Sequence, residues 1–399
     1  MNLNTEFIPF ARPSIGIAEE EAVLRVLRSG WLTTGNEAHL FEREFGSFVG
    51  TRNALAVNSA TAGLHLALEA ANVRPGDRVA MSPYTFASTA EVVRYVGADP
   101  LFVDIEEESC NIDPNELEAA AEKDSTIRAV MPVHIAGDPC RMDRILDLAD
   151  RYNLITVEDA AHAFPVRVNT GTPPRFAGTA GSIGVYSFYA TKTITTGEGG
   201  MVVTDDEGFA RRMKIMRLHG IDRDVWNRYT ARGASWEYAV VAPGYKYNLT
   251  DLAAAIGRVQ LSQAEAFLAR RVAIARAYDA AFRLRDYLEL PPSGGPRYEH
   301  HAWHLYMLRV KPERLTIDRN QFVERLSAEG IGTSVHFIPL HLMPYYRDRY
   351  GYRPEDFPRS LSRFSTTISL PIYPGLTDDQ VDRIMQAVLR IGDSCHKVS

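Results

Sequence analysis

The sequence predicts an α/β protein in which a large domain has a mostly parallel central sheet covered by helices and a smaller C-terminal domain is α+β. Between about residues 50 and 215, short strands that are apolar throughout alternate with helical segments, which is typical of a parallel sheet buried on both faces. A long helical stretch without proline then follows at residues 250–285. We expect this stretch to link a large domain at residues 1–260, with the N-terminal segment included, to a small domain at residues 261–399.

The expected elements of the large domain follow one another closely. Strands are predicted at residues 53–58, 78–81, 100–103, 129–134, 154–157, 185–188 and 201–204. Helices are predicted from Ser59 onward and at residues 89–96, 114–122 and 142–152. Ligands of such sheets collect at the carboxyl ends of the strands, so polar residues that follow these strands are the first candidates for a site.

The small domain is predicted from a change of pattern after the proline- and glycine-rich residues 291–295. The order becomes a strand at residues 305–310, a helix at residues 319–329, a strand at residues 332–337 and a final helix at residues 378–391. This short alternation is the basis for the α+β assignment.

The composition excludes several classes of protein. Hydrophobic residues make up 45% and charged residues 24% of the 399 residues, which is ordinary for a soluble globular chain. The net charge of -6, with acids and bases mixed, offers no basic surface for nucleic acid or an anionic membrane. We find no signal-peptide pattern and no apolar run long enough to span a bilayer, and therefore expect a cytoplasmic protein. Cys110, Cys140 and Cys395 lie too far apart for a disulfide framework or a metal site.

The first polar cluster, residues 58–63 (NSATAG), lies between a strand and a helix. Small residues at a helix N-terminus let backbone N–H groups approach an anion, and the hydroxyls of Ser59 and Thr61 add donors. Alone, this signal is also explained by Ser59 acting only as an N-cap.

The second cluster, residues 157–162 (VEDAAH), ends an apolar strand. Asp159 could simply cap the next helix. A buried carboxylate, however, needs a cationic partner. A protonated pyridine ring is such a partner, and the pair makes the ring a better electron sink.

The third cluster, residues 187–193 (SFYATKT), precedes a glycine-rich turn at residues 196–200. Most lysines are solvated surface charges. Lys192 instead follows an apolar strand and an aromatic pair, so we expect a partly desolvated amine with a lowered pKa that can act as a nucleophile. The fourth cluster, residues 243–251 (PGYKYNLTD), reads by itself as a polar loop that caps a helix.

Taken in order, these clusters resemble the DegT/StrS family of sugar aminotransferases, which are pyridoxal-phosphate enzymes of fold type I. The resemblance begins at residues 30–35 (GWLTTG), continues through residues 301–306 (HAWHLY) and reaches residues 370–374 (LPIYP). It therefore covers nearly the whole chain and implies the fold-type-I architecture.

The resemblance implies that Lys192 holds pyridoxal 5'-phosphate (PLP) as a Schiff base and that Asp159 pairs with its pyridine nitrogen. Phe86 would stack on one ring face. His162 stands where most relatives have Gln, facing the ring or its hydroxyl. The expected cofactor contacts are Ser59, Ala60, Thr61, Phe86, Asp159, His162, Ser187, Lys192, Lys246 and Asn248.

In these relatives, the loop around residues 244–251 reaches the cofactor phosphate of the neighbouring subunit. The resemblance therefore implies a homodimer with shared active sites. The pair Lys246 and Asn248 is most similar to enzymes that aminate C4 of nucleotide-linked sugars, including the aminoarabinose enzyme that modifies the lipid A of lipopolysaccharide.

The implied reaction moves an amino group from L-glutamate, which leaves as 2-oxoglutarate, to a UDP-, TDP- or GDP-linked keto-sugar in amino-sugar biosynthesis. The expected substrate contacts are Trp31, Thr33, His304, His336 and His341.

Four other readings remain open at this point. A C3 aminotransferase would share the cofactor motifs. Sugar dehydratases of the family lack the Schiff-base lysine, so Lys192 argues against them. A lyase or desulfurase of the same fold is a further reading, and a desulfurase would need a catalytic cysteine, for which only Cys140 lies near a strand end. A sensor that keeps the fold is disfavoured, because Lys192 and Asp159 are both present and no DNA-binding segment is added.

Overall fold

The computed structural model describes residues 6–170, 173–222, 238–292 and 300–397. Residues 293–295 of the proline- and glycine-rich segment lie outside these ranges. Within them, no helix combines the length and apolar character needed to cross a membrane.

The large domain contains a seven-stranded sheet with the order β1-β9-β8-β5-β4-β2-β3. Its strands are β1 (Asn53–Val57), β2 (Arg78–Met81), β3 (Asp99–Phe102), β4 (Ile127–Val130), β5 (Ile155–Asp159), β8 (Ile183–Ser187) and β9 (Gly200–Thr204). The five strands β8, β5, β4, β2 and β3 run parallel, and β9 runs antiparallel to both β8 and β1. All seven predicted strands form, and the mostly parallel sheet is confirmed.

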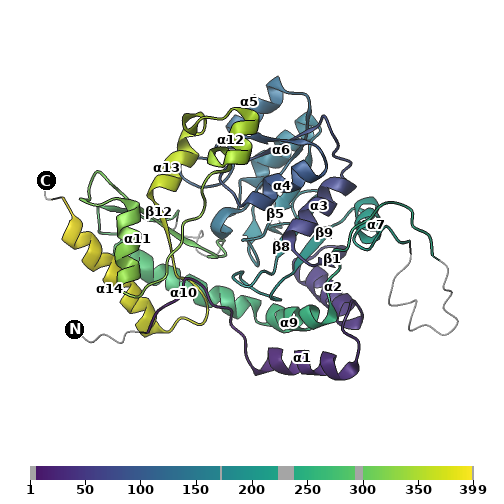
Figure 1. Cartoon of the computed structure of the whole chain (residues 1–399), viewed down its shortest axis with the longest axis horizontal. Coiled ribbons are helices and arrows are strands. Elements are labelled where there is room, and N and C mark those ends of the chain that lie inside the picture. Colours follow the sequence, from purple (N-terminus) through teal and green to yellow (C-terminus); the bar gives the residue numbers. More distant parts are fainter. Residues whose placement is uncertain (1–5, 171–172, 223–237, 293–299, 398–399) are drawn as a thin grey trace.

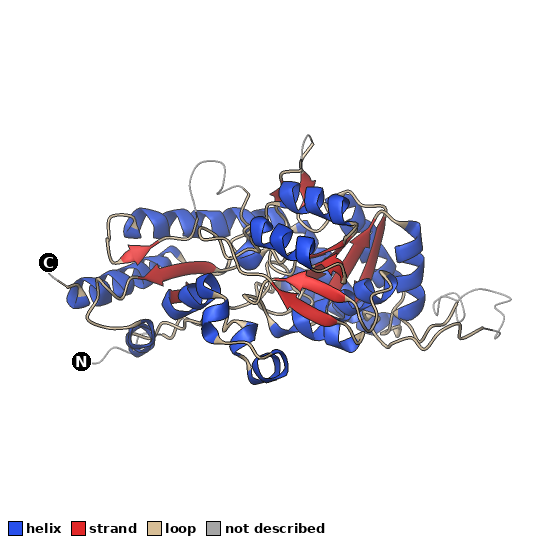
Figure 2. Cartoon of the chain, turned by 90° about the horizontal axis from the view of Figure 1, so that it is seen from above, coloured by secondary structure: helices blue, strands red, loops and turns tan. Residues whose placement is uncertain are grey.

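Helices cover both faces of this sheet (Figures 1 and 2). The predicted helices are α3 (Ala60–Ala70), α4 (Ala87–Tyr95), α5 (Pro114–Lys123) and α6 (Met142–Tyr152). Helices that we did not predict are α1 (Ile17–Ser29), α2 (Asn36–Val49) and α7 (Glu207–Met216). At Gly63 of α3, an added Cβ would lie 2.7 Å from Val185 and 2.9 Å from Val202. The missing side chain therefore lets the first turn of α3 approach the sheet closely.

The predicted linking helix is two helices, α9 (Asp251–Ser262) and α10 (Ala264–Phe282). Gln263 lies between them, and its side-chain amide donates to Glu19 of α1 at 2.8 Å. Figure 1 shows this pair running from the large domain to the small one.

The small domain has an antiparallel sheet with the order β10-β11-β12. Its elements are β10 (Leu288–Glu289), β11 (Tyr306–Val310), α11 (Arg319–Ala328), β12 (Thr367–Leu370) and α14 (Asp378–Cys395). The strand predicted at residues 332–337 is wrong. Because β12 occupies the position beside β11, that segment meets the sheet at one residue only, through the bridge between Ser334 and Ser369.

The two cores do not divide strictly at residue 260. Ile8 belongs to the core of the small domain and bridges Ile331, although we expected the N-terminal segment in the large domain. Conversely, the core beside β2 and β3 includes Leu340, Tyr346 and Phe357. These residues come from the segment that contains η3 (Leu340–Leu342), α12 (Pro344–Tyr350), η4 (Pro354–Asp356) and α13 (Pro358–Thr366). A hairpin of β6 (Arg167–Val168) and β7 (Arg175–Phe176) completes the described strands.

Candidate active site

A cavity of about 450 Å³ opens where the parallel strands end, between the sheet and the small domain. This volume is within the range of small-molecule sites. Its lining residues are Ser59, Ala60, Thr61, Leu64, Thr85, Phe86, Ser88, Val133, Asp159, Ala161, His162, Ser187, Tyr189, Thr191, Lys192, Glu198, Gly199, His304, His336 and Phe337.

Asp159 is the last residue of β5 and is 4% exposed. Its carboxylate accepts hydrogen bonds from Thr89 Oγ1 at 3.0 Å and from the backbone N–H of Ala161 at 3.2 Å. Burial raises the pKa of Asp159, although these two bonds and the charge of Lys192 act in the opposite direction. A cation bound in the cavity would favour the ionised carboxylate.

Lys192 lies in the loop after β8, in a turn closed by the bond from its backbone N–H to Tyr189 O at 2.9 Å. Burial lowers the pKa of Lys192 to about 8, and Asp159 opposes this shift. About a tenth of the amine is therefore uncharged at pH 7, far more than for an ordinary lysine, and the uncharged form is the nucleophile.

One end of the cavity carries hydroxyl groups, and we call Ser59, Thr61 and Ser187 the hydroxyl end. Ser59 is the N-cap of α3 and accepts from Ala62 N at 3.1 Å, so its predicted capping role is confirmed. A Cβ on Gly200 would lie 2.8 Å from Ala60 N, so β9 runs directly against the first turn of α3. The helix N-terminus and the hydroxyls together suit an anion such as a phosphate.

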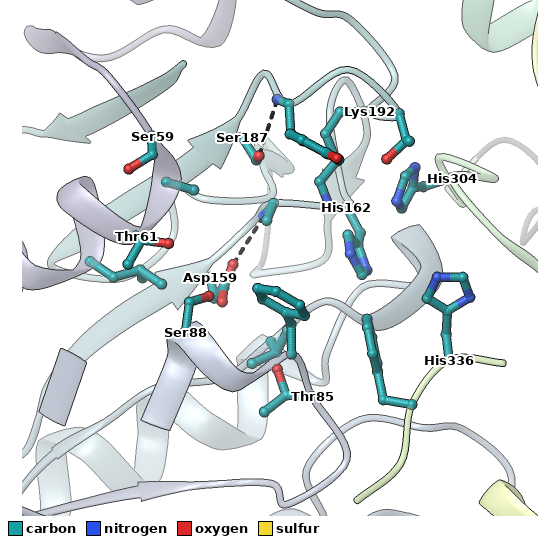
Figure 3. Close-up of a pocket in the computed structure, with 18 of the residues that line it drawn as sticks. Ser59, Thr61, Thr85, Ser88, Asp159, His162, Ser187, Lys192, His304 and His336 are labelled. Atoms are coloured by element: carbon teal, nitrogen blue, oxygen red, sulfur yellow. Dashed lines mark hydrogen bonds between the residues drawn. The ribbon is translucent and has the colours of Figure 1, made fainter. Parts of the chain in front are cut away.

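The other end carries three imidazoles, and we call His162, His304 and His336 the imidazole end (Figure 3). The rings of His162 and His304 lie 4.4 Å apart between centroids, and each residue is 6% exposed. Burial, assisted by the charge of Lys192, lowers the pKa of all three histidines, to about 4 for His336. All three are therefore neutral near pH 7.

Hydrogen bonds orient two of these rings. His162 Nδ1 accepts from the backbone N–H of Ala136 at 3.3 Å, so in the neutral ring Nε2 carries the proton. His336 Nδ1 lies 2.9 Å from Ser369 Oγ, and its carbonyl accepts from Tyr84 Oη at 2.6 Å.

His304 is presented by a strained turn. Trp303 is fully buried and takes a positive φ of 48°, which is rare for a large side chain. His301 Nδ1 accepts from Trp303 N at 2.8 Å, and Arg271 Nη1 donates to Trp303 O at 3.1 Å. The sequence analysis missed Arg271, because an arginine in a helix of charged and apolar residues is usually interpreted as part of the solvent-exposed face.

Phe86, the N-cap residue of α4, leaves much of its ring free at the cavity. It is 60% exposed, and its centroid lies 6.2 Å from that of Phe337. An open aromatic face beside Asp159 and Lys192 suits a planar ring.

Some predicted contacts do not line this cavity. Lys246 Nζ donates to Asn248 Oδ1 at 2.6 Å, and Asn248 Nδ2 donates to Thr34 Oγ1 at 2.6 Å. Trp31 joins the same cluster by donating to Thr34 O at 3.1 Å, and Thr33 O accepts from Asp251 N at 3.2 Å.

His341 also does not line the cavity. It is fully buried, packs on Phe357 at 4.8 Å between ring centroids, and lies 3.2 Å from Pro354 O.

Cys140 does not have the character of a catalytic thiol. It is 4% exposed, its Sγ donates to Val133 O at 3.2 Å, and burial holds its pKa well above the usual range. A reactive cysteine needs the opposite environment. The part of the chain that the structure describes also contains no group of His, Cys, Asp or Glu side chains that could hold a metal ion.

The cavity fits PLP in four respects. Asp159 offers a carboxylate to the ring nitrogen, Lys192 an amine to the aldehyde carbon, Phe86 a stacking face, and the N-terminus of α3 donors to the phosphate. These four groups line one space, which is the arrangement that the cofactor requires.

Comparison with known proteins gives consistent results. A model of the DegT/DnrJ/EryC1/StrS aminotransferase family matches residues 13–389. An uncharacterized protein of Methanocaldococcus jannaschii is 46% identical over 98% of each chain. The spore coat polysaccharide biosynthesis protein SpsC of Bacillus subtilis is 45% identical over 96% of each chain. Among solved structures, the putative sugar aminotransferase Spr1654 of Streptococcus pneumoniae in its PMP form has a TM-score of 0.88 and 31% identity, covering 97% of this chain and 99% of that one. The same protein in its PLP form has a TM-score of 0.87.

Proposed function

Because the chain belongs to the DegT/DnrJ/EryC1/StrS aminotransferase family and is a PLP-dependent sugar aminotransferase, we propose that it moves an amino group from L-glutamate to C4 of a nucleotide-linked keto-sugar. The observation that carries the assignment of residues is that Lys192 and Asp159 line one buried cavity, at the ends of adjacent parallel strands. When bound, PLP supplies an electron sink at the substrate carbon and carries the amino group between the two substrates.

In this proposal, Lys192 Nζ holds the cofactor, is released when the amino donor binds, and then moves the proton at the substrate carbon. Its lowered pKa supports this role, because the amine must both accept and return a proton near neutral pH. Asp159 keeps the ring nitrogen protonated. Its bonds from Thr89 and Ala161 fix the carboxylate before the reaction begins.

The hydroxyl end would bind the phosphate through Ser59, Thr61, Ser187 and the backbone of Ala60, at the positive end of α3. His162 would donate its Nε2 proton to the ring hydroxyl, where most relatives carry Gln. Its bond from Ala136 supports this tautomer.

Lys246 and Asn248 would complete the phosphate site of a second copy of the chain. They lie together, with Trp31 and Thr33 nearby, outside the lining of their own cavity. A homodimer with shared active sites would place this cluster, including the proposed substrate contacts Trp31 and Thr33, at the mouth of the neighbouring cavity.

The preference for C4 rests on the resemblance of the loop around residues 244–251 to that of C4 aminotransferases. The preferences for a UDP-, TDP- or GDP-linked sugar and for glutamate come from the same family resemblance. The name of the relative SpsC, a polysaccharide biosynthesis protein, supports a product for surface polysaccharide, and we include lipopolysaccharide in the proposal. We also propose that the enzyme acts in the cytoplasm. His304 and His336 line the cavity and remain proposed substrate contacts, whereas the position of His341 does not support that role.

Absorbance of the PLP-loaded protein tests the proposal in two half-reactions. We expect L-glutamate to remove the absorbance band of lysine-bound PLP, and one sugar in a panel of nucleotide-linked 4-keto and 3-keto sugars to restore it. Lys192→Ala is the control and should show no such band.

If only a 3-keto sugar restored the absorbance band, the proposed position of amination would be C3 instead of C4. A protein that forms no Lys192-dependent band, or whose band glutamate leaves unchanged, would refute the assignment of residues or donor.

A further inference from the structure

Arg271 of α10 is a buried cation for which the described residues provide no acidic partner. It is 2% exposed, and its guanidinium donates only to the backbone carbonyls of Trp303, at 3.1 Å, and Ile372, at 2.6 Å, while Nε has no partner. Burial lowers its pKa to about 10, so it remains charged at neutral pH. A buried charge without a counterion is costly, and an anion that binds nearby would offset this cost.

His304 lies next to this charge and lines the cavity. Its Nδ1 is buried and is not paired with any described residue. A buried polar atom without a partner costs about 1–3 kcal/mol, which is a reason to expect that a ligand contacts it. Its ring packs against that of His162, with 4.4 Å between the ring centroids.

The groups that face His304 from every packed element are basic or neutral. They are His162 after β5, Lys192 after β8, Arg271 on α10 and His336 beyond α11. The acids that line the cavity are Asp159 and Glu198, whereas the side chains that act most strongly on the pKa of His304 are all basic. This end of the cavity therefore has a positive potential.

The two substrates of an aminotransferase differ in the charge of the groups around the reacting carbon. An amino-acid donor has a carboxylate on the carbon that bears the transferred nitrogen, whereas a keto-sugar has only uncharged groups around its reacting carbon. A directly contacting arginine would be left unpaired in the sugar half-reaction. An imidazole can be charged with the first substrate and neutral with the second.

We propose that His304, with His162 beside it and Arg271 behind it, forms the subsite that binds the α-carboxylate of the amino donor. This inference rests on the proposed aminotransferase function. It implies that binding of a dicarboxylate takes up a proton from solvent onto His304, because a bound anion raises the pKa that burial, His162 and Lys192 hold low.

Calorimetry of the PLP-loaded enzyme with 2-oxoglutarate tests this subsite. 2-Oxoglutarate keeps the donor's carboxylates but has no amine to react with the cofactor. Titrations in two buffers of different ionisation enthalpy give the number of protons taken up. We expect uptake by the wild type, and for His304→Gln about 10- to 100-fold weaker binding with reduced uptake, as for the loss of a hydrogen bond to a charged group.

The exposed neighbour His300 provides the matched control, His300→Gln, which should bind as the wild type does. His162→Gln introduces the residue that most relatives carry and gives a second test if His304→Gln does not fold. We expect it to weaken binding as well, because it removes the ring that packs against His304.

Wild-type affinity for 2-oxoglutarate in whichever of the two variants folds would overturn the subsite. The absorbance band of bound PLP separates this result from failure of the proposed function. If the wild type shows that Lys192-dependent band while the variants bind 2-oxoglutarate normally, only the subsite is wrong.

Discussion

The two ends of the cavity are built in different ways. The hydroxyl end lies on regular elements, where β1 leads into α3, β8 ends at Ser187 and β9 packs against the helix. The imidazole end is assembled from three separate segments that carry His162, His304 and His336. In the proposed function, one end would hold the same phosphate throughout the cycle, and the other would receive two different substrates in turn. The difference indicates that the rigid scaffold serves the constant ligand and the irregular segments serve the changing ones.

The largest effect is expected at Lys192, which lies between the two ends. Lys192→Ala should lower the transamination rate by at least about 10³-fold, because the variant has no amine to hold the cofactor or move the proton. Stopped assays of amino-sugar formation measure the loss. Thermal unfolding is the control, since a half-buried lysine contributes little to the core. More than a few per cent of wild-type activity would show that another residue is the base.

Asp159→Asn should act on both half-reactions equally and leave the two ends in place. We expect about 10²- to 10³-fold slower turnover, because the amide keeps the bonding geometry but not the charge that protonates the ring nitrogen. Rates of the glutamate and sugar half-reactions measure this effect separately. An unequal loss would link Asp159 to one substrate rather than to the cofactor.

The pKa of Lys192 predicts how the apoprotein captures PLP. Below a pKa of about 8, the amine is mostly protonated and cannot attack the aldehyde. The capture rate should therefore rise about tenfold per pH unit up to about pH 8 and level off above it. Stopped-flow absorbance between pH 6 and 10 follows this step. A midpoint above pH 9 would mean that Lys192 is not desolvated.

The hydroxyl end can be weakened alone by Ser187→Ala, with Ser88→Ala, at another serine that lines the cavity, as a matched control. Loss of one hydrogen bond to a phosphate should raise the Kd for PLP about tenfold, and leave the half-reaction rates of the loaded enzyme nearly unchanged. Fluorescence titration of the apoprotein gives the affinity. A slower half-reaction with the amino donor, without a weaker affinity for PLP, would show that the hydroxyl end does not act on the cofactor alone.

The smallest effect is expected for Ser59→Ala, which removes the side-chain cap of α3. The free energy of unfolding of the apoprotein should fall by about 1 kcal/mol. Denaturant unfolding measures the change, and Ser59→Asp, which keeps the cap, should restore stability while it weakens the binding of an anion. Unchanged stability in Ser59→Ala would show that the cap is replaced by water.

The same contrast explains what could be predicted from the sequence. The strands, the capping role of Ser59 and the joint placement of Lys192 and Asp159 follow from local patterns, because each lies within or directly after a periodic element. Arg271 carries no such signal. Its role depends on the turn at Trp303, whose positive φ arises from tertiary packing rather than from a glycine.

Errors cluster where long-range contacts decide the structure. Residues 332–337 are expected to form a strand, but β12 pairs with β11 instead. Both segments have strand-like composition, so composition does not show which of them joins the sheet. His341 is an expected substrate contact because residues 336–341 are expected at the mouth of the site, but the segment returns to the large core and His341 packs against Phe357.

The bridge between Ile8 and Ile331 affects the order in which the molecule can be completed during synthesis. The central sheet has its full sequence available once Thr204 has left the ribosome. Ile8 emerges earlier, yet the rest of its core comes from the last third of the chain, from Ile274 to Cys395. The first segment made is therefore among the last to find its partners. A protein fused to the N-terminus would consequently interfere with the folding of the small domain, which forms last, rather than with the folding of the central sheet.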